Sequence, residues 1–257
     1  MSVELFHRRS GSGPAIVLLH GLFGSSDNWG TVARDLTNDF DVTLVDLRDH
    51  GRSPHTDATD YLRMAEDVHA LFLRSGLTDA LLVGHSMGGK AAMVFAQRWP
   101  ELVKHLVVVD IGPREYPIGD HATIMEALLS SELSTKTSRQ EVEDHLERYI
   151  PEKGVVQFLL KSLYWSEPGK LAWRFNVPTL QRCLPEIHGG IGPAVVKTPT
   201  LFIRGGKSPY IVREDLPQIK EQFPNSRVET VAYAGHWVPA QAPEEVAAMI
   251  RGVAVNA

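Results

Sequence analysis

Ser86 has a glycine two residues before it and another two residues after it, in the sequence Gly-His-Ser-Met-Gly. An apolar run, residues 80–83, comes directly before this motif, and residues 90–98, which have helical character, follow it. A Gly-x-Ser-x-Gly motif between a strand and a helix is typical of a nucleophile elbow, a tight turn that presents a serine hydroxyl. Glycine is needed at positions 84 and 88, because side chains there would collide with the neighbouring helix and strand. The short pattern also occurs in ordinary glycine-rich turns, so the interpretation depends on partner residues elsewhere.

A serine nucleophile needs a base, because its hydroxyl is hardly ionised near neutral pH. His236 is the best candidate among the eleven histidines, since it follows the last predicted strand and such sites gather in loops at the carboxyl ends of strands. We expect His85 to point away from the hydroxyl and His20 to brace the loop that follows it. The remaining histidines without a site context are predicted to lie at the surface, namely His50, His55, His105, His121, His145 and His188.

Asp110 is the candidate for the acid that orients this histidine. It ends the apolar run 106–109, which is predicted to lie beside the strand that carries Ser86, so the two side chains should share one edge of the sheet. Glu214 and Asp215 are the alternatives. They lie in a predicted first helical turn, where acidic residues are also favoured by the helix dipole.

Two backbone amides are candidates for stabilising an oxyanion. The Met87 amide should lie at the positive end of the helix that follows Ser86. The second donor is expected from the loop His-Gly-Leu-Phe-Gly at residues 20–24, whose glycines allow a sharp turn and a close approach to a substrate. We assign it to the Leu22 amide, with Phe23 as the alternative after a shift of one residue.

Short apolar runs alternate with amphipathic runs of helical length along most of the chain. Alternating strands and helices predict an α/β fold, a doubly wound and mostly parallel sheet. Residues 3–7 alternate in polarity and suggest an additional antiparallel edge strand. The predicted buried strands are residues 15–19, 42–45, 80–83, 106–109, 200–203 and 228–231, and the predicted helices are residues 28–36, 61–75, 87–98, 212–222 and 243–253.

One interval interrupts this alternation. Residues 112–197 contain no credible buried parallel strand and read as several short amphipathic helices without strands. We therefore predict a core made of residues 1–112 and 198–257, with residues 113–197 inserted as a helical cap. The insertion leaves after one strand and returns before the next, which places it over the carboxyl ends of the strands, where open α/β sheets bind ligands.

The composition restricts the class of protein. The chain has 257 residues, 43% of them hydrophobic and 22% charged, as expected for a packed globular fold, and its net charge of -5 argues against a nucleic-acid surface. Cys183 is the single cysteine, which excludes an intrachain disulfide and a cysteine metal cage. Neither a signal peptide nor a membrane span is predicted, so we expect a cytoplasmic protein that needs no metal and no organic cofactor.

The chain resembles the α/β-hydrolase fold superfamily over nearly its whole length, and it is similar within it to the YbfF-type bacterial esterases. The order of the candidates Ser86, Asp110 and His236 along the chain is the α/β-hydrolase order. The segments that carry the closer resemblance are residues 20–25, 84–90, 173–178, 206–210 and 235–237.

The resemblance implies an ester hydrolase that acts on short to medium acyl esters, with acyl-CoA thioesters as a further substrate class. In many relatives the acid follows the strand predicted here at residues 200–203, but the corresponding position holds Ser208. The resemblance therefore implies a displaced acid at Asp110, with Ser208 as an auxiliary. Lys207, beside that serine, is a departure from the family. The residues expected to line the substrate pocket are Phe23, Tyr210 and Trp237 from the core, and Phe158, Tyr164, Trp165 and Trp173 from the cap.

Two other functions would fit the same residues. A cofactor-free perhydrolase or a carbon–carbon bond hydrolase can use the same three side chains. A ligand-binding protein on an enzyme fold is the alternative from another class, because a fold alone does not establish an activity. The sequence leaves the oligomeric state, the physiological substrate and the preferred acyl length open.

Overall fold

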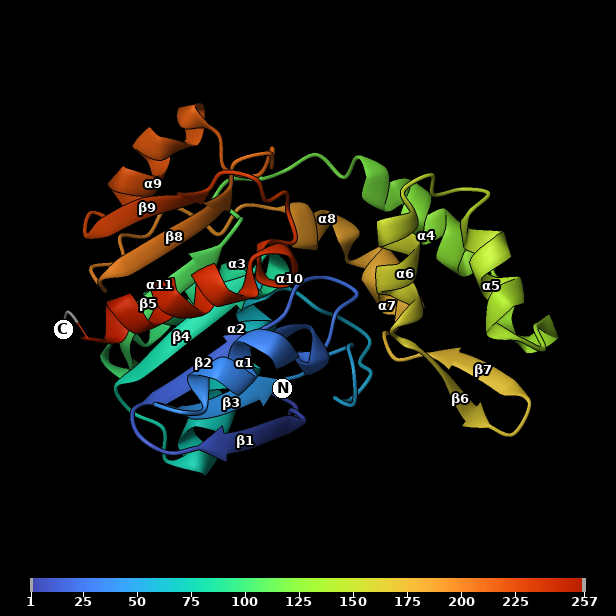
Figure 1. The fold of residues 1–257 in the computed structure, drawn as a ribbon, viewed down its shortest axis with the longest axis horizontal. Helices are drawn as coiled ribbons and strands as arrows, with labels where there is room; N and C mark the ends of the chain where they lie inside the picture. Colours follow the sequence, from blue (N-terminus) through green and yellow to red (C-terminus); the bar gives the residue numbers. More distant parts are fainter. Residues whose placement is uncertain (1, 256–257) are drawn as a thin grey trace.

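The computed structural model describes residues 2–255 and contains a seven-stranded sheet with helices on both faces (Figure 1). The strand order is β1-β3-β2-β4-β5-β8-β9, and every pair of neighbours is parallel except β1 and β3. This is the mostly parallel α/β fold that the sequence predicts. The strands of the sheet are β1 (His7–Gly11), β2 (Ala15–Leu19), β3 (Asp41–Val45), β4 (Ala80–His85), β5 (Val103–Val109), β8 (Thr200–Gly205) and β9 (Ser226–Val231).

Alternate residues of the central strands supply two separate hydrophobic cores. In β2, Ile16 and Leu18 pack with one core, Val17 and Leu19 pack with the other, and all four are fully buried. This is why the parallel strands read as continuous apolar runs rather than as alternating ones. The first core is covered by α1 (Gly30–Leu36) and α11 (Pro243–Val255), and the second by α2 (Tyr61–Ser75), α3 (Met87–Arg98) and α9 (Leu216–Gln222).

Helix α2 shows how local signals set the boundaries of an element. The Asp60 side chain caps its start by accepting a hydrogen bond from the Arg63 amide at 2.7 Å. Gly76 ends it in the left-handed conformation, with a φ of 62°. Between these caps, Met64 and Val68 lie one turn apart and are fully buried. The predicted bounds of this helix are therefore confirmed.

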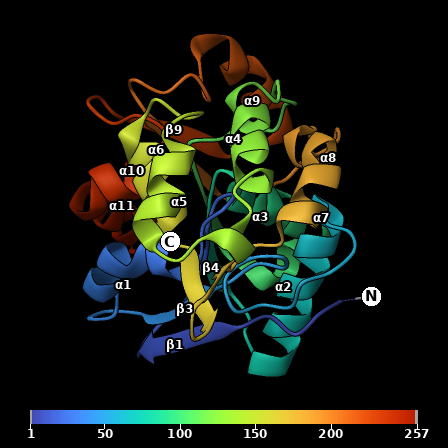
Figure 2. The same ribbon diagram turned by 90° about the vertical axis from the view of Figure 1, so that its right-hand side faces the viewer.

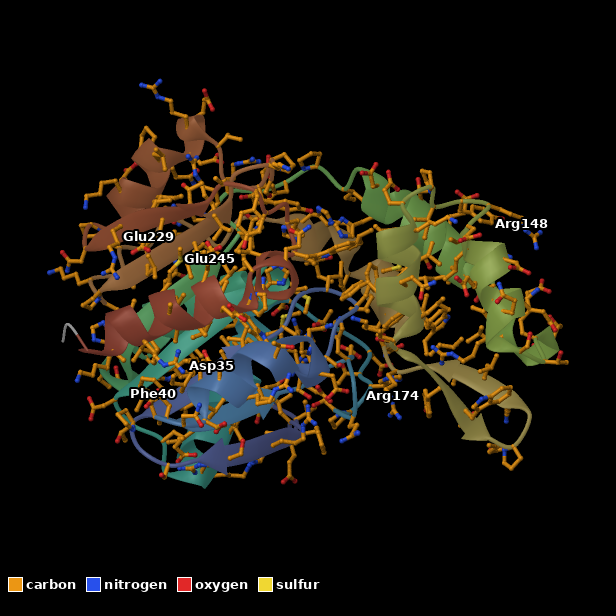
Figure 3. All side chains as sticks on the ribbon, in the orientation of Figure 1. Asp35, Phe40, Arg148, Arg174, Glu229 and Glu245 are labelled. Atoms are coloured by element: carbon orange, nitrogen blue, oxygen red, sulfur yellow. The ribbon has the colours of Figure 1, made fainter. Side chains whose placement is uncertain are left out.

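The segment between β5 and β8 forms no strand of the main sheet. Its elements extend beyond the carboxyl ends of the sheet strands, on the right in Figure 1 and facing the viewer in Figure 2. In Figure 3, Arg148 of this segment and Glu229 of β9 mark opposite ends of the molecule. The elements are α4 (Asp120–Leu129), α5 (Arg139–Leu146), α6 (Lys153–Leu160), β6 (Leu163–Glu167), β7 (Lys170–Trp173), α7 (Val177–Arg182) and α8 (Leu184–His188).

The expectation that this segment contains helices without strands is wrong. Strands β6 and β7 pair in an antiparallel hairpin, separate from the main sheet. Pro168 and Gly169 connect them, and Gly169 has a φ of 78°, a conformation that glycine adopts readily. A Pro-Gly pair between short runs rich in aromatic and branched residues is a turn signal, and here it joins two partly exposed antiparallel strands rather than buried parallel ones.

The edge strand was predicted with the correct type but the wrong position. Strand β1 pairs antiparallel with β3 at residues 7–11 rather than 3–7. The preceding residues are held by side chains instead of by a neighbouring strand: the Val3 amide donates to Asp67 Oδ1 at 2.7 Å and the Phe6 amide to Ser53 Oγ at 2.8 Å. Polarity alternation therefore identified the element but not its register.

Two predicted helices begin as 3₁₀ turns, Ser26–Trp29 before α1 and Arg213–Asp215 before α9. The remaining short helices are the 3₁₀ turns Pro100–Leu102 and Leu133–Thr135, and α10 (Val238–Gln241). Across residues 2–255, no helix is both long and apolar enough to cross a membrane.

Candidate active site

Ser86 lies in a sharp turn between β4 and α3. Its φ is 52° and its ψ is -121°, a backbone conformation that non-glycine residues rarely adopt. A Cβ atom added at Gly84 would lie 2.2 Å from the carbonyl oxygen of Gly88, and one added at Gly88 would lie 2.4 Å from the carbonyl oxygen of His20. Both distances are steric clashes. The elbow interpretation of the motif therefore agrees with the observed backbone.

Three side chains that are far apart in the sequence form one chain of hydrogen bonds. The Ser86 hydroxyl lies 3.0 Å from Nε2 of His236, and Nδ1 of the same ring lies 2.8 Å from Oδ2 of Asp110. A buried carboxylate accepts a hydrogen bond, so Nδ1 carries the proton and Nε2 is free to accept one from the serine. The sequence candidates for nucleophile, base and acid are thus in direct contact.

The Asp110 carboxylate is fully buried and accepts hydrogen bonds at both oxygens. Oδ1 accepts from the amide of Gly205 at 2.8 Å, and Oδ2 accepts from the hydroxyl of Ser208 as well as from the His236 ring. The Ser208 oxygen in turn accepts from the amide of Tyr210 at 3.2 Å. Converging donors of this kind compensate a buried charge for its loss of water.

The two alternative acids do not reach the histidine. Asp215 is buried and accepts a hydrogen bond from Nε of Arg114 at 2.7 Å, while Glu214 is exposed. Neither side chain forms a hydrogen bond with His236 in the described part of the chain.

Several contacts fix the orientation of the His236 ring. The Tyr210 ring stacks on it with centroids 3.9 Å apart, and the side chain of Gln241 accepts from the amide of Gly235 at 2.8 Å. Nε2 of His85 donates to the His236 carbonyl at 2.9 Å. Burial lowers the pKa of His85 to about 3, so this residue is a neutral structural neighbour.

The amides of Leu22 and Met87 donate no hydrogen bond to any residue in the range 2–255. Phe23, the alternative to Leu22, is different, because its amide donates to Nε2 of His50 at 3.1 Å. Burial lowers the pKa of His50 to about 3, so its ring remains a neutral acceptor. An amide that is already bonded cannot also bind an oxyanion well, which favours Leu22 over Phe23.

The expectation that the six remaining histidines lie at the surface is wrong for five of them, and only His55 is exposed. His50 is completely buried beneath the loop of residues 20–24, and His121, His145 and His188 are buried or partly buried in the inserted segment and its contacts with the core. His105 of β5 is partly buried. His121 also lines the cavities beside Ser86. These environments are created by segments that are distant in the sequence, so the local pattern around each histidine gives no sign of them.

Two cavities meet at Ser86. The larger has a volume of about 710 Å³ and lies between the core and the inserted segment, and the smaller has a volume of about 30 Å³. We call them the large chamber and the small chamber. The large chamber is lined by residues that include Leu22, Phe23, Ser86, His121, Ile124, Phe158, Tyr210, His236 and Trp237. The small chamber is lined by Leu22, Tyr61, Ser86, Met87, Lys90, Ile111, Tyr116, His121, Ile187, His188 and Tyr210.

Some of the predicted pocket residues line a chamber and others do not. Phe23, Tyr210 and Trp237 line the large chamber, whereas Ser208 lines neither chamber and contacts Asp110 instead. Of the four aromatic residues named in the inserted segment, Phe158 lines the large chamber and stacks on Trp237 with centroids 5.6 Å apart. The other three do not line it: Trp165 is exposed, Trp173 stacks on Phe175, and Tyr164 lies beneath the guanidinium of Arg174.

Lys90 is a residue of the site that the sequence analysis missed. Only 1% of it is exposed, and its ammonium donates to the carbonyl oxygens of Arg114 at 2.7 Å and Gly189 at 2.5 Å. Burial lowers its pKa to about 7. A lysine four residues after Ser86, within the apolar run that follows it, is the signal that could have identified it, because residues i and i+4 share one helix face.

No group of three or more histidine, cysteine, aspartate or glutamate side chains in the described chain is arranged to hold a metal ion.

The chain belongs to the α/β hydrolase family, which matches residues 16–249. Esterase YbfF of Escherichia coli strain K12 is 40% identical over 236 residues, which cover 92% of this chain and 91% of that protein. The sn-1-specific diacylglycerol lipase ABHD11 of Mus musculus is 37% identical over 248 residues, which cover 90% of this chain and 78% of the mouse protein. The solved structure of a marine microorganism esterase is 40% identical with a TM-score of 0.96, and the match covers 98% of this chain and 100% of that one.

These similarities confirm the resemblance to the YbfF-type esterases and the α/β-hydrolase fold. They also identify the protein as a hydrolase of the carboxylesterase type.

Proposed function

We propose that the protein hydrolyses carboxylic esters through an acyl-enzyme intermediate on Ser86, with His236 as the base and Asp110 as the acid. The observation that carries this proposal is the unbroken chain of hydrogen bonds from the Asp110 carboxylate through the His236 ring to the Ser86 hydroxyl, at 2.8 and 3.0 Å. The names of the relatives support an ester as the substrate.

In the first half of the reaction, Ser86 Oγ attacks the acyl carbon while His236 Nε2 takes the hydroxyl proton. The carbonyl oxygen becomes an oxyanion, which the amides of Leu22 and Met87 stabilise. Collapse of this intermediate breaks the bond to the alcohol oxygen, and the imidazolium returns the proton to the leaving alcohol. Asp110 keeps the ring in the required tautomer and stabilises its charged form.

In the second half, a water molecule attacks the acyl-enzyme. His236 accepts one proton from this water and then delivers it to Ser86 Oγ as the acid leaves. One ester and one water thus give one acid and one alcohol, and Ser86 regains its proton. Both halves of the reaction use only the three side chains, the two backbone amides and water.

We further propose that residues 113–197 act as a cap on a core formed by residues 1–112 and 198–257. The large chamber supports this division, because Phe158 and Ile124 of the inserted segment line it together with Phe23 and Trp237 of the core. A pocket closed by an insertion over the carboxyl edge of the sheet lets the inserted segment determine which substrates fit.

The test of the proposed function is the Ser86→Ala variant. Its rate of p-nitrophenol release from p-nitrophenyl acetate should be at least about 10⁴-fold lower than that of the wild type, because no other group can form the acyl-enzyme. Circular dichroism provides the control for folding, and a fluorophosphonate probe should label the wild-type protein but not the variant. Undiminished turnover by Ser86→Ala would exclude Ser86 as the nucleophile.

A further inference from the structure

The two chambers at Ser86 differ in volume by more than an order of magnitude, at about 710 and 30 Å³. An ester has two halves, and the proposed mechanism constrains them differently. The leaving alcohol must lie beside His236 Nε2, which returns its proton. The acyl carbonyl must lie with its oxygen at the Leu22 and Met87 amides.

The lining of the chambers matches this division. His236 and its neighbour Trp237 line the large chamber and not the small one, whereas Met87 lines the small chamber and not the large one. Leu22 and Ser86 line both, as expected for groups at the reacting carbon. Building on the proposed function, we infer that the large chamber receives the alcohol and the small chamber receives the acyl group, so that the enzyme cleaves short-chain acyl esters of bulky alcohols.

The size of the small chamber sets the limit on the acyl chain. One water-sized sphere requires about 10–15 Å³ of such a cavity, so about 30 Å³ holds roughly two to three heavy atoms beyond the carbonyl carbon. An acetyl group or one of up to about four carbons fits this space. The fatty acyl chain of a long-chain lipid does not.

Hydrogen bonds across the walls oppose a widening of the small chamber. The Tyr61 hydroxyl donates to the carbonyl oxygen of Ile187. The Tyr116 hydroxyl donates to the carbonyl of Tyr210 at 2.6 Å and accepts from the amide of Gly112 at 2.7 Å. A longer acyl chain would have to break these bonds and leave buried polar groups without partners, which costs about 1–3 kcal/mol for each group.

Lys90 makes the end of the small chamber polar. Its side chain lies one helical turn after Ser86, and its ammonium is held by two carbonyl oxygens and lies 4.8 Å from the centroid of the Tyr116 ring. The terminal methyl groups of a longer chain would contact this ammonium instead of an apolar wall. Such a contact removes water from a polar group without replacing its hydrogen bonds.

Two series of substrates test the assignment of the chambers. In the first, the alcohol is fixed as p-nitrophenol and the acyl group lengthens from acetate through butyrate and hexanoate to octanoate. We expect kcat/KM to fall at least about tenfold between butyrate and hexanoate. In the second, the acyl group is fixed as acetate and the alcohol grows from phenol to 2-naphthol, two leaving groups of similar acidity, and kcat/KM should be maintained or rise.

A matched pair of variants separates the two chambers. Ile187 lines the small chamber only and Ile124 lines the large chamber only. Ile187→Ala should raise the ratio of hexanoate to butyrate kcat/KM by about tenfold, whereas Ile124→Ala should leave it unchanged. This ratio is independent of the fraction of folded enzyme, so a loss of stability does not affect the comparison. Ile187→Val provides a milder version of the same change.

Faster cleavage of octanoate than acetate, or a change of the acyl ratio in Ile124→Ala but not in Ile187→Ala, would overturn the assignment and leave the ester hydrolysis itself intact. A lack of turnover with every ester of both series would instead refute the proposed function.

Discussion

At the scale of single residues, the proposed acid, Asp110, is supported by a hydrogen bond from Ser208. The carboxylate comes from the end of β5, and the serine that follows β8 donates a hydrogen bond to it. The two groups come from the carboxyl ends of neighbouring strands, and only the Asp110 carboxylate contacts the His236 ring. Asp110 after β5 supplies the negative charge, and Ser208 in the loop after β8 supplies a hydrogen bond to it.

We predict that Asp110→Asn lowers kcat by about 10⁴-fold, as the corresponding change does in a serine protease of another fold. The amide group of asparagine can donate to Nδ1, which would place the ring proton on Nε2 and prevent it from accepting the serine proton. Steady-state kinetics with p-nitrophenyl acetate measures the effect. Asp215→Asn is the matched control, since neither Asp215 nor its partner Arg114 lines a chamber or bonds to His236, and it should retain nearly full activity. A larger loss of kcat in Asp215→Asn than in Asp110→Asn would show that the acid is misassigned.

At the scale of elements, the loop of residues 20–24 depends on a histidine from another loop. The Phe23 amide donates to His50 Nε2, and Nδ1 of His50 donates to the carbonyl oxygen of Arg48 at 2.9 Å. Phe23 has a φ of 61°, so the loop adopts a conformation that needs external support. His50 thereby holds the segment that presents the Leu22 amide.

We predict that His50→Ala lowers kcat by about 10–10²-fold, because a displaced Leu22 amide stabilises the oxyanion less well. The KM for p-nitrophenyl acetate should change much less, since the walls of the chambers remain. His55→Ala is the matched control, because His55 is exposed on the neighbouring chain segment and should have no effect. Equal kcat values for both variants would contradict a positioning role for His50.

The elements and the site differ in how far the sequence predicts them. Helix α2 and the strands β2 and β4 follow from local periodicity and caps, which act over a few residues. The candidates Ser86, Asp110 and His236 could be selected because each follows a strand, and parallel strands share one carboxyl edge. The burial of His50 and Lys90 could not be predicted in this way, because it depends on loops and on an inserted segment that pack against them from distant parts of the chain.

At the scale of the whole molecule, the buried histidines determine how stability depends on pH. Burial lowers the pKa of His50 and His85 to about 3 and that of His121 to about 4, from an ordinary value of 6.5. Below pH 6.5 the unfolded chain binds protons that the folded protein cannot bind. Stability is therefore fully present above pH 6.5 and decreases as the pH falls towards these lowered pKa values.

We predict that the free energy of unfolding falls between pH 7.5 and pH 5 by about 2 kcal/mol for each of these histidines. Urea denaturation followed by circular dichroism at the two pH values measures this change. His85→Phe and His55→Phe form a matched pair, since the first removes one buried ring from the titration and the second removes an exposed one. A wild-type protein that is equally stable at both pH values would contradict the prediction.

The hydrogen bonds of Lys90 also constrain how the large chamber can open. Arg114 and Gly189 belong to the stretches where the inserted segment departs from the core and returns to it, and one ammonium on α3 holds both. The base of the insertion is thereby anchored to the same helix that carries the serine turn. The helices of the insertion that line the large chamber, α4 and α6, are therefore attached to the core at a root that is fixed relative to the serine turn.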